Sequence, residues 1–258
     1  MINLKTPHEI RLMRRAGNRL ARVVEDLEAA CRAGVTTGAL DELANRRIRA
    51  RGGRPGFLGY QGYRKSICTS INDVAVHGIP GDQTIGDGDI VSLDLGLVID
   101  GFWADMGCTV LVGAVSENAR RLVAVTDQCL DVAIQAAQPG GRLGDISAAI
   151  QRHAEQAGFS VIRQFVGHGI GRSMHEDPQV PNFGEPGTGP ELKPGMVLAI
   201  EPMINEGEPD VIIHDDGWTV STADGKLSAY REHTVAVTAE GPLVLTAPDP
   251  EEGDPLRD

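Results

Sequence analysis

Four stretches of the chain place apolar residues at helical spacing between residues that begin or end helices. The first follows Thr6-Pro7, where a threonine cap, a proline in the first turn and Glu9 three positions after the cap predict a helix that reaches about Cys31. Gly34 then breaks the pattern. The other predicted helices span about 37–51, 116–138 and 143–157.

Apolar and polar residues alternate on both sides of Asp100-Gly101, a dipeptide that favours a two-residue type I′ hairpin turn. With such a turn, Asp94 lies opposite Gly107, and Asp105 shares its face as a diagonal neighbour, with Cβ atoms roughly 7 Å apart. The other face is apolar throughout and is predicted to be core. Two carboxylates on one glycine-lined face either share a proton, hold cations or are simply solvated.

Four more runs have the composition of β-strands and carry polar residues at an end or in the middle. His77 and His168 directly follow the first two runs, Glu201 ends the third, and Glu232 lies within the fourth. We expect these side chains to lie where strands end or cross a cleft. The predicted strands cover about 66–76, 158–167, 196–201 and 227–238.

The two helical parts share positions at a constant offset of 106 residues. The pairs are Gly34 and Gly140, Gly38 and Gly144, Leu40 and Ile146, and Gly52 and Gly158. The offset indicates two copies of one unit, over about 6–110 and 116–240, related by a pseudo-twofold axis. We expect a single catalytic domain over 1–247 with a cleft at the seam between the halves, and a disordered acidic tail over 248–258.

Composition narrows the class of protein. With 41% apolar and 23% charged residues, the 258-residue chain is expected to be a globular protein. A net charge of -12 without a basic block argues against nucleic acid or an anionic membrane as partner. The start lacks the pattern of a signal peptide, so we expect a cytoplasmic protein. Four cysteines without paired metal spacing are expected to be reduced, buried thiols.

Five dispersed residues combine into candidate metal chemistry: Asp94, Asp105, His168, Glu201 and Glu232. Taken singly, each has an ordinary explanation, such as a buried ion pair with an arginine, a hydrogen-bonded core histidine or an exposed strand edge. Together, four carboxylates supply about four negative charges, which two divalent cations neutralise, and this donor set suits first-row metals better than structural zinc. Two such metals about 3.5 Å apart can share and acidify one water.

The segments around these residues read SLDLG, a Trp-x-Asp strand, GHGIG, IEPM and REHT. In these motifs the chain resembles the type I methionine aminopeptidases of metallopeptidase family M24, from the first helix to about Val244, in the short form without an N-terminal extension. The resemblance implies a pita-bread α/β (α+β) fold with antiparallel sheets inside and helices outside. It also implies release of the initiator methionine from new chains when the second residue is small.

The resemblance assigns roles to the five candidate ligands. Asp94 is expected to chelate one metal, Asp105 and Glu232 to bridge both, and His168 and Glu201 to complete the second. Glu201 is also expected to take a proton from the bridging water. The cofactors implied are two divalent ions per chain, from among cobalt, manganese, iron, nickel and zinc.

The family pattern also assigns residues that contact the peptide. His77 and His175 match two histidines that are not ligands and that contact the peptide and the tetrahedral intermediate. Asn72 and Ser228 match a monovalent-cation site. A narrow apolar S1 pocket fits an unbranched thioether side chain. The residues that match this pocket are Tyr60, Tyr63, Cys68, Met203 and Trp218.

Some residues depart from the family pattern, and the sequence is also compatible with other functions. Phe57, Met174 and Tyr230-Arg231 differ from many relatives, which bears on pocket shape and second-residue preference. The expected partner is the N-terminal peptide of new proteins, at the ribosome, and the chain is expected to be a monomer. The alternatives are a proline-directed Xaa-Pro aminopeptidase on the same fold, a non-catalytic binding protein, and a mononuclear oxygenase that uses His77 with another histidine.

Overall fold

The hairpin centred on Asp100-Gly101 has the predicted register in the computed structural model, which describes residues 1–249. Strands β4 (Ile90–Ile99) and β5 (Phe102–Leu111) pair so that Asp94 lies opposite Gly107 and Asp105 opposite Gly96. The two turn residues have φ of 52° and 78°, both positive as a type I′ turn requires. The predicted core face is buried against helix α1 (Pro7–Ala30), so the acidic face points the other way.

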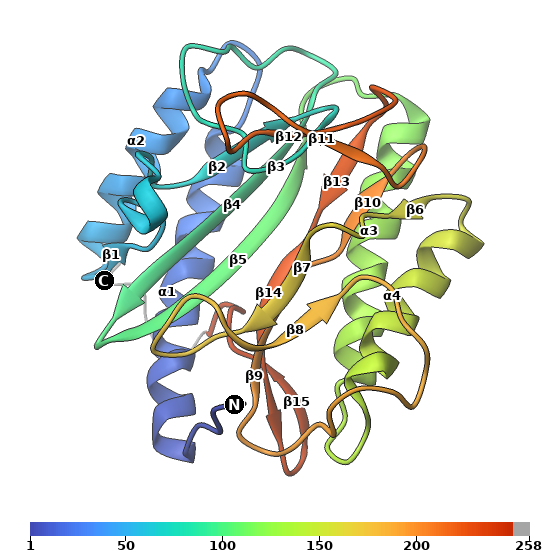
Figure 1. Cartoon of the computed structure of the whole chain (residues 1–258). Coiled ribbons are helices and arrows are strands. Elements are labelled where there is room, and N and C mark those ends of the chain that lie inside the picture. Colours follow the sequence, from blue (N-terminus) through green and yellow to red (C-terminus); the bar gives the residue numbers. More distant parts are fainter. Residues whose placement is uncertain (250–258) are drawn as a thin grey trace.

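All four predicted helices are confirmed. The Thr6 hydroxyl accepts the Glu9 N–H while a Glu9 carboxylate oxygen accepts the Thr6 N–H, which completes the predicted capping box of α1. Figure 1 shows α1 behind the β4–β5 hairpin and α2 to its left, with α3 and α4 at the right of the view. The remaining helices are α2 (Thr37–Ala50), α3 (Glu117–Ala136), α4 (Leu143–Gln156) and the short 3-10 helix η1 (Tyr60–Gly62).

Curled antiparallel sheets lie between the helices. Within residues 1–249 the main sheet runs in the order β1-β4-β5-β14-β9-β7-β8, with β2 added to β4 and β15 to β14. Two smaller sheets have the orders β13-β10-β6 and β11-β12-β3. The mixed α/β architecture predicted from the sequence is therefore present. The remaining bounds are β1 (Arg54–Pro55), β2 (Cys68–Ile71), β3 (Val74–Val76), β6 (Ser160–Val161), β7 (Val166–Gly169), β8 (Glu176–Pro181), β9 (Val197–Ile200), β10 (Met203–Asn205), β11 (Val211–Ile213), β12 (Val220–Thr222), β13 (Ser228–Tyr230), β14 (Glu232–Thr238) and β15 (Gly241–Val244).

Three of the predicted continuous strands are divided. The run 66–76 turns at Asn72, whose φ of 56° ends β2 and redirects β3 into another sheet. The run 227–238 divides at Arg231, whose N–H donates to the Pro202 carbonyl instead of extending the ladder. The run 158–167 similarly separates into β6 and β7, and β7 continues through His168. Because of these breaks, each run contributes one strand to each of two sheets. The breaks in the runs 227–238 and 158–167 place Glu232 and His168 in the main sheet.

The positions related by 106 residues have matching conformations in the two halves. Gly34 and Gly140 have φ of 87° and 84°. A side chain at Gly38 or Gly144 would place its Cβ 2.9 Å or 2.3 Å from a backbone carbonyl oxygen of a crossing segment. Glycine is therefore required at these positions in both halves, which agrees with the predicted pseudo-twofold repeat. The domain limits 1–247, 6–110 and 116–240 stay predictions, and most of the predicted disordered tail, 250–258, lies outside the described residues.

Each half buries its own apolar cluster. One cluster lies between α1, α2 and the core face of the β4–β5 hairpin, and the other lies between α3, α4 and strands β9 and β14. The four cysteines, Cys31, Cys68, Cys108 and Cys129, are buried free thiols, as predicted. In the described residues no helix is both long and apolar enough to span a bilayer. These two clusters do not cover the polar face of the main sheet, so this face is the place where a functional site is expected.

Candidate active site

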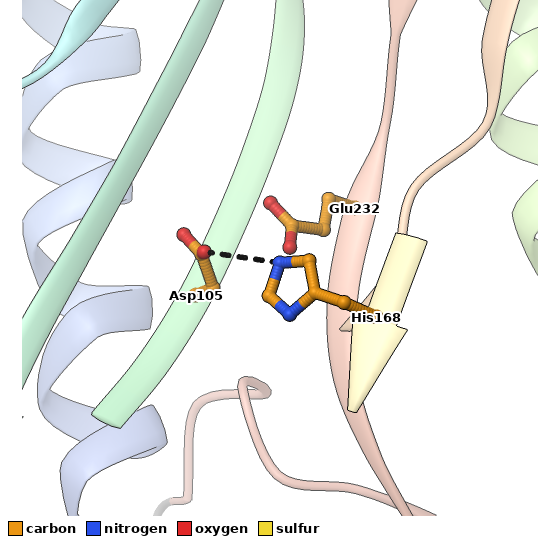
Figure 2. A group of neighbouring side chains, drawn as sticks. All are labelled: Asp105, His168 and Glu232. Carbon is orange, nitrogen blue, oxygen red and sulfur yellow. Dashed lines mark ion pairs between the residues drawn. The ribbon is translucent and has the colours of Figure 1, made fainter. Parts of the chain in front are cut away.

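Three buried residues from separate strands converge over the polar face of the main sheet. Asp105 lies on β5, Glu232 begins β14 and is paired with Gly107 of β5, and His168 lies on β7. One ligand atom from each lies within 4.8 Å of the others. Figure 2 shows the three side chains pointing into one common space. Their exposed fractions are 3%, 1% and 6%, so this polar group is enclosed by protein.

Glu201 and Asp94 complete the predicted set around this space. His168 Nε2 lies 3.6 Å from Glu201 Oε1 and 4.0 Å from Asp105 Oδ2. Asp94 shares the hairpin face with Asp105, as their register requires, and the charge of Asp105 acts on its carboxyl. The structure thus brings together all five residues that the sequence analysis selected as metal ligands.

The tautomer of His168 follows from its hydrogen bond to the backbone. Its Nδ1 lies 2.9 Å from the carbonyl oxygen of Gly169, which can only accept, so Nδ1 carries the hydrogen. Nε2 therefore presents a lone pair toward the carboxylates of Asp105 and Glu201. Burial, followed by the neighbouring His175, lowers the pKa of His168 to about 4, so the ring is neutral at pH 7 and able to bind a cation.

The four carboxyl groups are in an environment that opposes their negative charge. Burial, and then repulsion from the other carboxylates, raises the pKa of Asp94, Glu201 and Glu232, while burial raises the pKa of Asp105 to about 7. Among the described ion pairs, the basic partner of this group is His168 rather than a lysine or an arginine. Asp105 Oδ1 and Glu232 Oε1 are buried without a hydrogen-bond partner. Buried, unpaired carboxylate oxygens beside a neutral imidazole fit a divalent-cation site.

We expect cation binding to release more protons at low pH than at high pH. The pKa of Asp105 is about 7 in the folded protein and about 3.9 in an unfolded chain. The cation-free folded protein therefore retains this proton between about pH 4 and 7, and the stability that this group contributes falls as the pH rises through that window. A bound cation displaces the proton. Calorimetry of Mn²⁺ binding in buffers of different ionisation enthalpy should show more proton release at about pH 6 than at about pH 8.5, and equal release would contradict the shift.

A mostly apolar pocket of about 160 Å³ adjoins the acidic cluster, and Asp94 forms part of its wall. Of the residues predicted to contact the peptide, His77, His175, Tyr60, Tyr63, Cys68 and Trp218 line it. Met203 is not among the lining residues, because its position on β10 opposite Tyr230 places its side chain in a buried cluster beside the pocket. Phe57, Gln61 and Met174 also line the pocket. Phe57 and Met174 are two of the predicted departures from the family pattern, whereas Gln61 was not predicted as a pocket residue. Its signal in the sequence is its place between the glycines and tyrosines of GYQGY.

The two histidines in the pocket wall have defined partners. His175 Nδ1 lies 2.6 Å from the Tyr60 hydroxyl, and its ring centre is 4.2 Å from that of His168. His77 has a φ of 59° and lies edge-on to Phe165 and Trp218. Burial lowers the pKa of both histidines, that of His77 to about 4. Both rings are therefore neutral at pH 7.

The remaining predicted positions do not line the pocket. Ser228 N donates to the Asn72 carbonyl at 2.9 Å, so the two residues matched to a monovalent-cation site are neighbours. The Asn72 side chain bonds to Asp89 and to the N–H of Ile90. The monovalent-cation site stays a prediction. The side chain of Arg231 does not turn toward the acidic cluster, because its Nε lies 3.4 Å from Asp127 on α3.

Comparisons with known proteins agree with this geometry. The model of metallopeptidase family M24 matches residues 11–239. Methionine aminopeptidase 1 of Bacillus subtilis is 48% identical over 246 residues, covering 95% of this chain and 99% of the relative. The methionine aminopeptidase of Escherichia coli K12 is 44% identical over 95% of this chain and 94% of its own length.

Solved structures give the same result. The methionine aminopeptidase of Thermotoga maritima superimposes with a TM-score of 0.94 at 44% identity, over 95% of this chain and 99% of that structure. Prolidase from Pyrococcus furiosus shares the fold, with a TM-score of 0.75 at 21% identity over 66% of its length. The chain belongs to metallopeptidase family M24. Within that family it is similar to the short bacterial methionine aminopeptidases along nearly its whole length, which confirms the resemblance seen in the sequence and does not favour the alternative functions.

Proposed function

We propose that this chain is a methionine aminopeptidase that removes the initiator methionine from new polypeptides. The observation that carries the proposal is that Asp94, one of the five clustered candidate ligands, lines the apolar pocket. A methionine side chain in this pocket would lie against aromatic edges, which favour a thioether sulfur. The bond that follows the methionine would then lie over the carboxylates.

The five clustered residues would hold two divalent cations. Asp94 would chelate one, Asp105 and Glu232 would bridge both, and His168 and Glu201 would complete the second. When bound, these cations supply Lewis acidity and an acidified water. Mn²⁺, Fe²⁺, Co²⁺, Ni²⁺ and Zn²⁺ all suit this oxygen-rich donor set with one imidazole.

The protein groups around this centre would handle protons and charge. Glu201, whose pKa is raised by burial and by Asp94, would accept the proton from the attacking water and pass it to the leaving amine. The Tyr60 hydroxyl would donate to Nδ1 of neutral His175, which leaves a hydrogen on Nε2 to stabilise the oxyanion. His77, in the pocket wall, would contact the peptide backbone.

The cellular setting belongs to the same proposal. The substrate would be the N-terminal peptide of a newly made protein, met at the ribosome in the cytoplasm, and the enzyme would act as a monomer. One monovalent cation would bind beside Asn72 and Ser228. This monovalent-cation site is supported by the hydrogen bond that the Ser228 N–H donates to the Asn72 carbonyl, which places the two residues side by side.

Peptide specificity tests the proposed function. Met-Ala-Ser should be cleaved about a hundredfold faster than Met-Lys-Ser in kcat/KM, because a long second side chain has to fit over the closed-in centre. Both peptides are assayed by release of free methionine after chelation and after adding back one metal at a time. Leu-Ala-Ser serves as the control for the pocket. Equal turnover of the two methionine peptides would reject the small-residue requirement, and release of methionine by chelated enzyme would reject metal dependence.

A further inference from the structure

A tyrosine that the proposed chemistry does not use lies against the acidic cluster. Tyr230, 3% exposed, directs its hydroxyl at Glu232, with 2.8 Å between Oη and Oε2. The other oxygen of Glu232, Oε1, is buried without a hydrogen-bond partner. The phenol therefore occupies one side of this carboxylate and leaves the other oxygen free.

Two features of β5 hold the phenol in this position. The Thr109 hydroxyl accepts the Tyr230 N–H at 2.9 Å and donates to the Tyr230 carbonyl at 2.8 Å. A Cβ on Gly107 would lie 2.1 Å from Cε1 of the Tyr230 ring. Strand β5 thus has no side chain where the ring lies, and the Thr109 hydroxyl of β5 holds the backbone of β13 beside it. The position of the ring is set by the strands rather than by a flexible loop.

Asp105, Glu201 and Asp94 lie close enough to Glu232 for their charges to oppose the charge of its carboxyl group. Tyr230 is thus a neutral donor to a carboxylate that its neighbours repel. A carboxylate that accepts a hydrogen bond is fixed in orientation, and partners of this kind support metal ligands.

We propose that Tyr230 is a positioning residue that orients Glu232 for divalent cations. The inference rests on the proposed metal centre. It makes the affinity for the cation depend on one hydroxyl group that contacts neither the pocket nor the peptide. Without that hydroxyl, the Glu232 carboxylate would have to be oriented at the moment of binding, so the affinity should fall.

The test is Tyr230→Phe, which removes the hydroxyl and keeps the ring. Calorimetry with Mn²⁺ alone should show a Kd about 10- to 100-fold weaker than in the unsubstituted protein. The visible spectrum of the Co²⁺-loaded protein should change, because the orientation of one proposed ligand, Glu232, changes. The thermal midpoint without metal should fall by only a few degrees, as expected for the loss of one buried hydrogen bond, and the protein should remain folded at the temperature of the titration, which separates loss of orientation from loss of folding.

A matched control is Thr126→Val, which removes a buried hydroxyl on α3 that bonds to the Leu122 carbonyl. Its affinity for Mn²⁺ should equal that of the unsubstituted protein. If Tyr230→Phe binds Mn²⁺ as tightly as the unsubstituted protein, the inference about Tyr230 is wrong and the proposed function stands. If the unsubstituted protein binds no divalent cation, the proposed function and the inference both fail.

Discussion

Replacing Asp105 with asparagine should reduce metal-dependent release of methionine by about a thousandfold or more, because the loss of several kcal/mol of Lewis-acid stabilisation corresponds to a factor of this size. Asp105 lies at the centre of the cluster, and one of its oxygens has no hydrogen-bond partner in the protein. An amide keeps the shape but removes the charge that Asp105 needs in its proposed role as a bridging ligand. The measurement is kcat/KM on Met-Ala-Ser across a Mn²⁺ titration, with bound metal counted separately.

The matched control for this substitution is Asp82→Asn, which removes the same charge from an exposed position. Its activity should equal that of the unsubstituted protein. Substitution of Asp105 should also raise the stability of the metal-free protein, since it removes a carboxyl group from a cluster of like charge. Full activity in Asp105→Asn would show that the ligands have been assigned incorrectly.

Lys5→Met should lower the free energy of unfolding by about 3 kcal/mol, because it leaves the buried carboxylate of Glu176 without the lysine ammonium that neutralises it. Lys5 Nζ lies 2.5 Å from Glu176 Oε2, and the side chains are 6% and 8% exposed. The same carboxylate accepts the N–H groups of Arg172 and Ser173, so it holds the turn that precedes His175. We expect a melting temperature about 6 °C or more lower, together with a lower kcat.

A double-mutant cycle with Glu176→Gln separates the ion pair from the turn. If the pair is responsible, the double variant should lose less stability than the two single variants added together. Lys193→Met, at an exposed position, controls for the loss of one positive charge. An unchanged melting temperature in Lys5→Met would mean that the turn stands on its backbone hydrogen bonds alone.

The parts of the fold that depend on residues close together in the sequence could be predicted from the sequence alone. A two-residue turn at Asp100-Gly101 admits one register, and this register alone put Asp94 and Asp105 on one face. The helix that starts at Thr6 was equally local, because its capping box involves residues three apart. Such features depend on steric and hydrogen-bond rules that act within a few residues.

The rest of the site could not be predicted, because it depends on contacts between residues that are far apart in the sequence. The break at Arg231 exists because its N–H meets the Pro202 carbonyl, a partner that no local pattern indicates. Gln61 enters the pocket wall through a loop conformation with a φ of 47°. Met203 resembles a pocket residue by its motif, yet it faces the buried cluster because β10 pairs with β13. Family motifs indicated which residues belong to the site, but tertiary pairing decided which way each side chain turned.

The hairpin imposes a rule of counting on the chain between its two aspartates. Successive side chains on a strand alternate between faces, so inserting or deleting a single residue within β4 or β5, between the turn and either aspartate, would rotate that carboxylate into the apolar layer beneath α1. A change of two residues would restore its facing but slide it past its glycine partner. Many residues along this stretch can be substituted, but the number of residues between the turn and each aspartate cannot change.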